Sequence, residues 1–122
     1  MSRADDHASA VAAVERIVAA GGEADDVLRA AVAAVHEQVP DYTWVALRFS
    51  EAGELVLGPS AGAEGGELLA KPVVYNGERI GQVEVAAHHL EGPDRAFLER
   101  IAVLISLHTL LGWDTGGDPW VP

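Results

Sequence analysis

Residues 73–85 read VVYNGERIGQVEV and decide how the chain folds. Two runs rich in Val, Ile and Tyr flank Asn76-Gly77. Asn-Gly is the dipeptide that most readily takes the positive φ angles of a type I′ turn, so the stretch predicts a two-residue β-hairpin. This turn sets a register in which Val74 opposes Arg79 and Val73 opposes Ile80.

That register predicts which side chains share a face of the sheet, because successive residues of a strand point to opposite sides. One face then receives Leu68, Ala70, Val83 and Val85, and the other receives Lys71, Gln82 and Glu84.

The stretch YTWVALRF at 42–49 alternates in the same way and predicts an earlier strand. A turn at Ala52-Gly53 and a strand at 54–59 complete a first hairpin. The alternation divides the earlier strand into one face with Thr43, Val45, Leu47 and Phe49, and another with Tyr42, Trp44, Ala46 and Arg48.

Helical patterns lie on both sides of the two hairpins. The first forty residues predict two helices, which Gly21-Gly22 separates and Pro40 ends. A long third helix is predicted from about Pro93 to Leu111. The short, glycine-rich segment 60–67 connects the hairpins.

This order of elements predicts the α+β class. We expect an antiparallel sheet of about four to five strands, with the two N-terminal helices and the long C-terminal helix packed on one face. The length of 122 residues suits a single domain over 1–122, and residues 112–122 have the turn-rich composition of an irregular tail.

The last helix is apolar on both sides. One side presents Phe97, Ile101, Leu104, His108 and Leu111, and the far side presents Val103, Leu107 and Leu110. We expect the sheet to cover the first side and a second copy of the chain to cover the far side, with help from Trp113 in the tail. His108 then becomes a buried neutral histidine bonded to backbone or a pH-sensitive interface residue.

Composition excludes several classes of function. The chain has no cysteine, which removes disulfides, thiolate nucleophiles and cysteine-based metal sites. Its formal net charge is −11 and its eight basic residues are scattered, so we expect neither a nucleic acid nor a membrane as partner. We find no signal peptide and no transmembrane span, and we expect a cytoplasmic protein.

The segment 71–112, with Pro72-Val73-Val74, the Ile80-Gly81 pair and the helix from Pro93, resembles the C-terminal half of a GAF domain. The first hairpin is similar to that of the same family, and the resemblance covers roughly residues 23–111. It implies a sensory fold with a small-molecule pocket. Family members usually carry another strand and short helices between the hairpins, whereas this chain has only segment 60–67.

The resemblance also bears on catalysis. The family branch that reduces free methionine sulfoxide uses cysteines in that middle region, and its IGVLDID motif reads IGQVEVA here, with Glu84 retained and Ala86 in place of the second acid. Because the chain lacks cysteine, we expect it not to be such an enzyme. We also find no catalytic grouping, no phosphate-cradling motif and therefore no cofactor.

The shortened middle region predicts that one face of the sheet is open. The candidate ligand-binding residues on it are Tyr42, Trp44, Arg48, Lys71, Gln82 and Glu84. The alternative is a plain solvated face with cross-strand charge pairs. His88 and His89 point to opposite sides of a strand, which predicts no metal site.

Together these observations indicate a non-catalytic sensory or interaction module that forms a homodimer and binds a small molecule or a protein. Two alternatives stay open: a ligand-binding domain or enzyme that uses the face around Trp44, Arg48 and Glu84, and a roadblock-like or other profilin-type dimeric scaffold.

Overall fold

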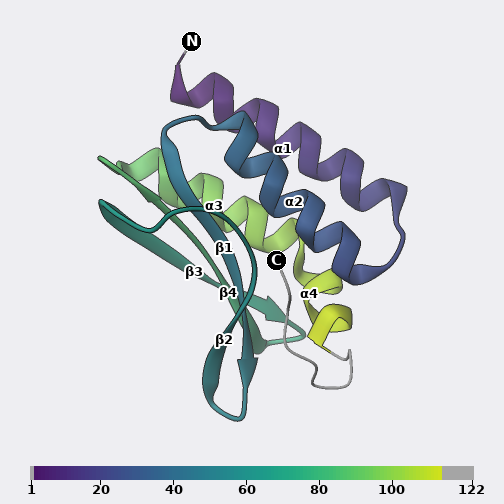
Figure 1. Cartoon of the computed structure of the whole chain (residues 1–122). Helices are drawn as coiled ribbons and strands as arrows, with labels where there is room; N and C mark the ends of the chain where they lie inside the picture. Colours follow the sequence, from purple (N-terminus) through teal and green to yellow (C-terminus); the bar gives the residue numbers. More distant parts are fainter. Residues whose placement is uncertain (1, 114–122) are drawn as a thin grey trace.

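The computed structural model describes residues 2–113. Figure 1 shows its elements in chain order: α1 (Arg3–Ala20), α2 (Ala24–Gln38), β1 (Tyr42–Glu51), β2 (Glu54–Gly62), β3 (Glu67–Tyr75), β4 (Glu78–Ala87), α3 (Gly92–Leu104) and α4 (Ser106–Trp113). The two predicted hairpins and the two N-terminal helices are present, and the final helix is divided into α3 and α4.

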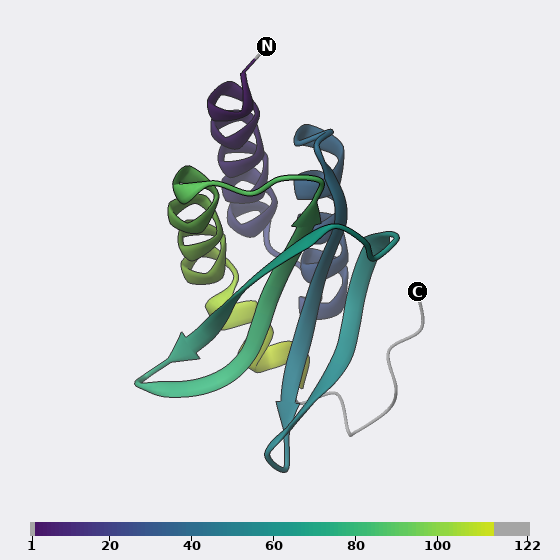
Figure 2. The ribbon, with the colours of Figure 1, turned by 90° about the vertical axis from the view of Figure 1, so that its left-hand side faces the viewer.

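The strands form one antiparallel sheet in the order β2-β1-β4-β3, so β1 and β4 are central and β2 and β3 are the edges. Figure 2 shows the helices on one side of the sheet. Helices α2 and α3 pack on the strands, and α1 packs on α2 and α3. The predicted α+β architecture is confirmed, and its opposite sheet face carries no helix from the described part of the chain.

The hydrophobic core lies between the helices and the sheet. Val45 and Leu47 of β1 and Val83 and Val85 of β4 are fully buried there, as alternation predicted. Leu28 and Val35 of α2 and Leu98 and Ile101 of α3 supply the helical side of the core.

The hairpin of β3 and β4 contains a bulge that the sequence did not reveal. Val74 opposes Arg79 as predicted, but Val73 opposes Gly81 instead of Ile80. One extra residue in one strand exchanges the faces of every residue beyond it. Lys71 therefore pairs with Val83 on the helix side, where its Nζ lies 2.9 Å from Oε1 of Glu99.

The same bulge also places two apolar residues of β3 on the sheet face opposite to the predicted one. Ala70 pairs with Glu84 and Leu68 pairs with Ala86, so both lie on the open face and not beside Val83 as predicted. Leu68 is 60% exposed.

A second irregularity lies at the start of β1. Tyr42 pairs with Ala87, and Trp44 pairs with the adjacent Ala86, which leaves Thr43 as the extra residue. The prediction that Tyr42 shares the open face with Trp44 is therefore wrong. Tyr42 is 1% exposed and belongs to the core on the helix side.

The final helix is broken at Ile105, whose φ of −96° and ψ of 2° depart from helical values. The Ser106 and Thr109 hydroxyls donate to the carbonyl oxygens of Val103 and Ile105, at 2.9 and 2.8 Å. Such local bonds compete with regular helix geometry. Beyond the break Leu110 packs against the core, contrary to its predicted position on the outer side.

The outer side of these helices is instead formed by Val103, Leu107 and Leu111, which are 65%, 46% and 52% exposed. His108 is half-buried, and its Nδ1 has no hydrogen-bond partner among the described residues, so the bond to backbone, one of the two roles expected for His108, is not made through this atom.

Trp113 ends α4, so the predicted tail at 112–122 overlaps the helix by two residues. The side chain of Trp113 and residues 114–122 lie outside the described structure. Within residues 2–113, no helix combines the length and the hydrophobicity that crossing a membrane requires.

Candidate functional site

A cavity of about 540 Å³ opens on the helix-free face of the sheet. Its wall is built from the four strands and from the connection between β2 and β3. The lining residues are Arg48, Leu55, Glu64, Gly65, Gly66, Leu68, Gln82, Glu84 and Ala86.

The connection at 63–66 is held close to the sheet by the glycines at its two ends. A Cβ on Gly62 would lie 2.0 Å from the carbonyl oxygen of Thr43, and one on Gly66 would lie 2.4 Å from that of Ala87. Both residues also have positive φ, at +87° and +77°. Only glycine permits this approach, and it places Glu64 beside the cavity.

The floor of the cavity is a hydrogen-bonded group centred on Glu84. Arg48 Nε donates to Glu84 Oε1 at 2.7 Å, and the indole Nε1 of Trp44 donates to Oε2 at 2.9 Å. Longer contacts of 3.5 and 3.4 Å come from Arg48 Nη2 and Gln82 Nε2. The four residues lie on neighbouring strands β1 and β4, where Arg48 pairs with Gln82 and Ala46 with Glu84.

Glu84 is a buried anion, because the residue is only 2% exposed. Burial acts to raise the pKa of Glu84, but the hydrogen bonds from Arg48 and Trp44 outweigh it and the pKa is lowered. The same hydrogen bond to Glu84 raises the pKa of Arg48, against the effect of burial. Arg48 and Glu84 are therefore both ionised, and their opposite charges cancel.

Glu64 makes a weaker contact with the same cation. Its Oε1 lies 3.5 Å from Nη2 of Arg48, and its side chain is 64% exposed. Arg48 thus bridges the buried carboxylate of the floor and the exposed carboxylate of the connection.

The lining of the cavity has the composition of a binding site. The lining side chains combine apolar surface from Leu55, Leu68 and Ala86 with a few fixed polar groups, which is the usual composition of a small-molecule site. Among the described residues that line it there is no Ser, Thr, Cys, His or Lys to act as a nucleophile.

Three of the six predicted ligand-binding residues line the cavity, namely Arg48, Gln82 and Glu84, and a fourth, Trp44, donates to Glu84 without lining the cavity itself. The two bulges carry Tyr42 and Lys71 to the opposite face of the sheet. Sequence reasoning missed Leu55, Glu64 and Leu68 as cavity residues. For Leu68 the correct register would have revealed the position, whereas the place of Glu64 depends on the fold of the glycine-rich connection.

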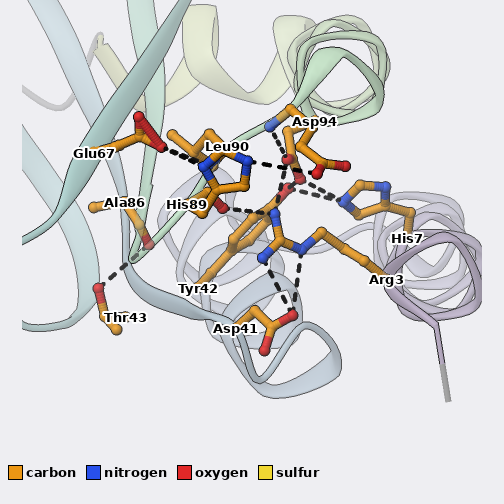
Figure 3. Close-up of polar contacts among 11 residues, drawn as sticks. Arg3, His7, Asp41, Tyr42, Thr43, Glu67, Ala86, His89, Leu90 and Asp94 are labelled. Atoms are coloured by element: carbon orange, nitrogen blue, oxygen red, sulfur yellow. Dashed lines mark hydrogen bonds and ion pairs between the residues drawn. The ribbon is translucent and has the colours of Figure 1, made fainter.

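A second group of polar side chains, which the sequence did not reveal, lies where α1, α3 and the start of β1 meet (Figure 3). The Tyr42 hydroxyl donates to Asp94 Oδ1 at 2.5 Å, and Nε2 of His7 lies 2.8 Å from that hydroxyl and 3.1 Å from Oδ1. Arg3 Nη1 donates to Asp94 Oδ2 at 2.9 Å. The ring of His7 stacks on Phe97 at 4.2 Å between centroids.

This group fastens three elements to one another. Asp94 also accepts the backbone N–H of Glu91 at 2.8 Å, so it caps α3 while holding Arg3 and His7 of α1 and Tyr42 of β1. Asp94 and Tyr42 are 0% and 1% exposed, which leaves no room for a ligand at these atoms. The group is a structural clamp.

The pKa values in the clamp follow its burial. Burial lowers the pKa of His7, and the nearby Asp94 opposes this only in part. For Asp94, burial acts to raise the pKa, but the hydrogen bonds from Tyr42, Glu91 and Arg3 lower it. Burial, together with Asp94, raises the pKa of Tyr42. At neutral pH the clamp is therefore an Asp94–Arg3 ion pair with a neutral histidine.

The His88-His89 pair behaves as a strand-end pair. His89 lies 3.2 Å from Glu67 and 3.5 Å from Glu91 through its two ring nitrogens, at an exposed position. No group of three or more metal-binding side chains is assembled within residues 2–113.

No protein-family model matches the chain, and no curated protein sequence is detectably similar to it. Solved structures do share its fold. A GAF sensor protein from Burkholderia vietnamiensis is 17% identical, with a TM-score of 0.75 over 88% of this chain and 96% of that one. The GAF domain of an Acinetobacter phosphoenolpyruvate-protein phosphotransferase is 12% identical, with a TM-score of 0.72 over 96% of this chain and 99% of that one.

The free methionine-R-sulfoxide reductase of Neisseria meningitidis, solved with its substrate, is 15% identical. It has a TM-score of 0.79 over 91% of this chain and 92% of the reductase. The present chain has no cysteine with which to carry out the chemistry of that enzyme branch. At these identities the comparisons establish architecture, and the architecture of this chain is the GAF fold.

Proposed function

We propose that this chain is a non-catalytic GAF-like sensory module that binds a small ligand in the cavity on its open sheet face and acts as a homodimer. The observation that carries the proposal is the cavity of about 540 Å³, whose floor includes the ion pair of Arg48 and Glu84, held from behind by the indole of Trp44. A buried ion pair at the base of a half-apolar cavity offers fixed polar contacts with little reorganisation on binding.

A thermal-shift screen against a broad metabolite set tests ligand binding. The variant Leu68→Trp fills the cavity from an exposed edge position and leaves the buried ion pair in place, so it should fold and lose the shift. Val56→Trp is the matched control, because Val56 is 38% exposed on β2, pairs with Phe49 on the helix side of the sheet and does not line the cavity.

Changes in the floor give a second comparison. Trp44→Ala and Arg48→Ala should also lose the shift, since both side chains contact Glu84. Equal shifts for the wild type, both floor variants and Leu68→Trp would overturn the proposal.

The dimer is proposed on the outer side of α3 and α4. Val103, Leu107 and Leu111 expose a row of apolar side chains, and a cavity of about 330 Å³ lies beside it, between Val103 and the edge strand β3. Leu110, which the sequence also assigned to this interface, packs against the core behind the row, and the side chain of Trp113 lies outside the described residues. A two-fold pair of such surfaces is the commonest way for a small domain to bury them.

A catalytic role has less support, because the polar groups of the cavity are an ion pair, an amide and an exposed carboxylate, with no Ser, Thr, Cys, His or Lys among the described lining residues. The roadblock-like alternative also forms a dimer, but it binds no small ligand. A ligand-dependent shift that disappears in Leu68→Trp therefore separates the two hypotheses.

A further inference from the structure

We infer that the ligand of this cavity is a small organic cation, an amine that joins an ammonium group to an apolar body and carries no carboxylate. The inference rests on the proposed function, because it names the chemical class that the same cavity selects. It follows from the charges, the pairing and the apolar surface of the lining residues.

The cavity holds more negative than positive charge. Its lining residues include one cation, Arg48, and two anions, Glu64 and Glu84. Arg48 and Glu84 neutralise each other through the 2.7 Å contact, which leaves the charge of Glu64 without an equal partner. The surplus charge therefore attracts a cation.

Glu64 also has acceptor capacity to offer. Its single contact with a cation in the described structure is the 3.5 Å approach to Arg48, and a carboxylate can accept about four hydrogen bonds. By comparison, Glu84 already receives bonds from Trp44, Arg48 and Gln82. An ammonium group beside Glu64 gains charge-assisted hydrogen bonds without disturbing the floor.

An anionic ligand meets the opposite situation. The one lining cation, Arg48, already directs Nε and Nη2 to carboxylates. An anion could therefore accept only from Nη1 of Arg48 without competing for those bonds, and it would stand beside the carboxylates of Glu64 and Glu84, which repel it. The carboxylate of a free amino acid meets the same obstacle.

Apolar surface defines the rest of the ligand. Leu55 and Leu68 both line the cavity, one from each edge strand, and they are 38% and 60% exposed. An apolar body packed against either side chain removes apolar surface from water and gives these exposed leucines a partner.

Isothermal titration calorimetry with two matched series tests the inference. Each series keeps one apolar body and changes the charge: 2-phenylethylamine, phenylalanine and 3-phenylpropionate, and then 3-methylbutylamine, leucine and 4-methylpentanoate. In at least one series the amine should bind tightest, with an affinity about tenfold or more above that of its amino acid. A loss of this size is expected when the added carboxylate opposes one set of charge-assisted hydrogen bonds.

The variant Glu64→Gln should weaken the amine about three- to tenfold, as expected for a charged hydrogen bond at a partly exposed position. Glu37→Gln is the control, because it removes the same charge from an exposed site on α2, across the sheet, and should leave the affinity unchanged.

Tighter binding of a carboxylate or an amino acid, or equal affinities in wild type and Glu64→Gln, would overturn the cation inference. So would a failure of both amines to bind. In each case the proposed function stands if the metabolite screen still gives a shift that Leu68→Trp abolishes, and it falls with the inference if that screen is also negative.

Discussion

At the scale of single residues, the ion pair of Arg48 and Glu84 stabilises the open face only as a pair. Removing Arg48 leaves a carboxylate that is 2% exposed without its cation. We predict that Arg48→Met lowers the free energy of unfolding by about 3 kcal/mol, the usual cost of breaking a buried pair from one side. Urea denaturation measures it.

The double variant Arg48→Met/Glu84→Gln should recover much of this loss, since the amide of the glutamine is neutral and its oxygen can still accept from Trp44. If both variants have the same stability, Glu84 is not held as an anion by Arg48.

His7 predicts a pH dependence in the clamp. Its pKa in the folded protein lies below the ordinary value of 6.5, so the unfolded chain binds a proton that the folded protein does not. Stability is therefore full above about pH 6.5 and falls as the pH decreases toward the folded pKa, by up to about 1.4 kcal/mol per pH unit. Denaturation at several pH values between 5 and 7.5, about this midpoint, measures the slope.

The groups that face His7 are Arg3 and Asp6 on its own helix, Tyr42 on β1 and Asp94 on α3. In His7→Gln the slope should disappear, and in the exposed control His88→Gln it should persist. An unchanged slope in His7→Gln would assign the pH dependence to another group.

At the scale of elements, the connection between β2 and β3 depends on its two glycines. We predict that Gly62→Ala lowers the free energy of unfolding by more than about 2 kcal/mol, because a Cβ would lie 2.0 Å from the Thr43 carbonyl oxygen and φ is +87°. Gly66→Ala should behave similarly.

The matched control is Gly92→Ala in the first turn of α3, where a Cβ has nothing within 4 Å and φ is not positive. It should change stability by less than about 1 kcal/mol. Thermal denaturation compares the three variants, and equal losses at all three positions would contradict the close approach of the connection to the sheet.

The sequence reveals elements more readily than their register. The alternation of residues correctly predicted that Val45 and Val83 are buried, and the Asn76-Gly77 dipeptide correctly predicted where the hairpin turns. The two bulges were not predictable, because an extra residue leaves the local pattern of strand residues intact. Each bulge changed the face of a candidate residue, Tyr42 in β1 and Lys71 in β3.

The clamp and the cavity wall escaped prediction for a related reason. Asp94 and His7 are 87 residues apart and meet only after three elements pack together. Glu64 lies in a segment whose sequence indicates only a connection, and the glycine-dependent path of that segment brings it to the cavity and to Arg48. Long-range placement of this kind carries no local signal in one sequence.

At the scale of the whole molecule, the outer row of α3 and α4 predicts self-association. Leu107→Asp places a charge in the centre of this row and should convert the dimer to a monomer in sedimentation-velocity experiments at micromolar concentration. Ala33→Asp adds the same charge to an exposed position of α2 and should remain dimeric. If the wild-type protein sediments as a monomer at high micromolar concentration, the proposal that it forms a dimer is wrong.

The same scale sets the central claim, that this chain of 122 residues, with a short connection between its hairpins, has a ligand cavity on the open face of its sheet. Native mass spectrometry of the freshly purified protein tests it most directly, because one spectrum reports subunit number and any retained molecule. We predict a dimer that carries additional mass in the wild type and a bare dimer for Leu68→Trp. A wild-type spectrum at the bare mass of the 12.8 kDa chain, identical in form to that of the variant, would contradict the account.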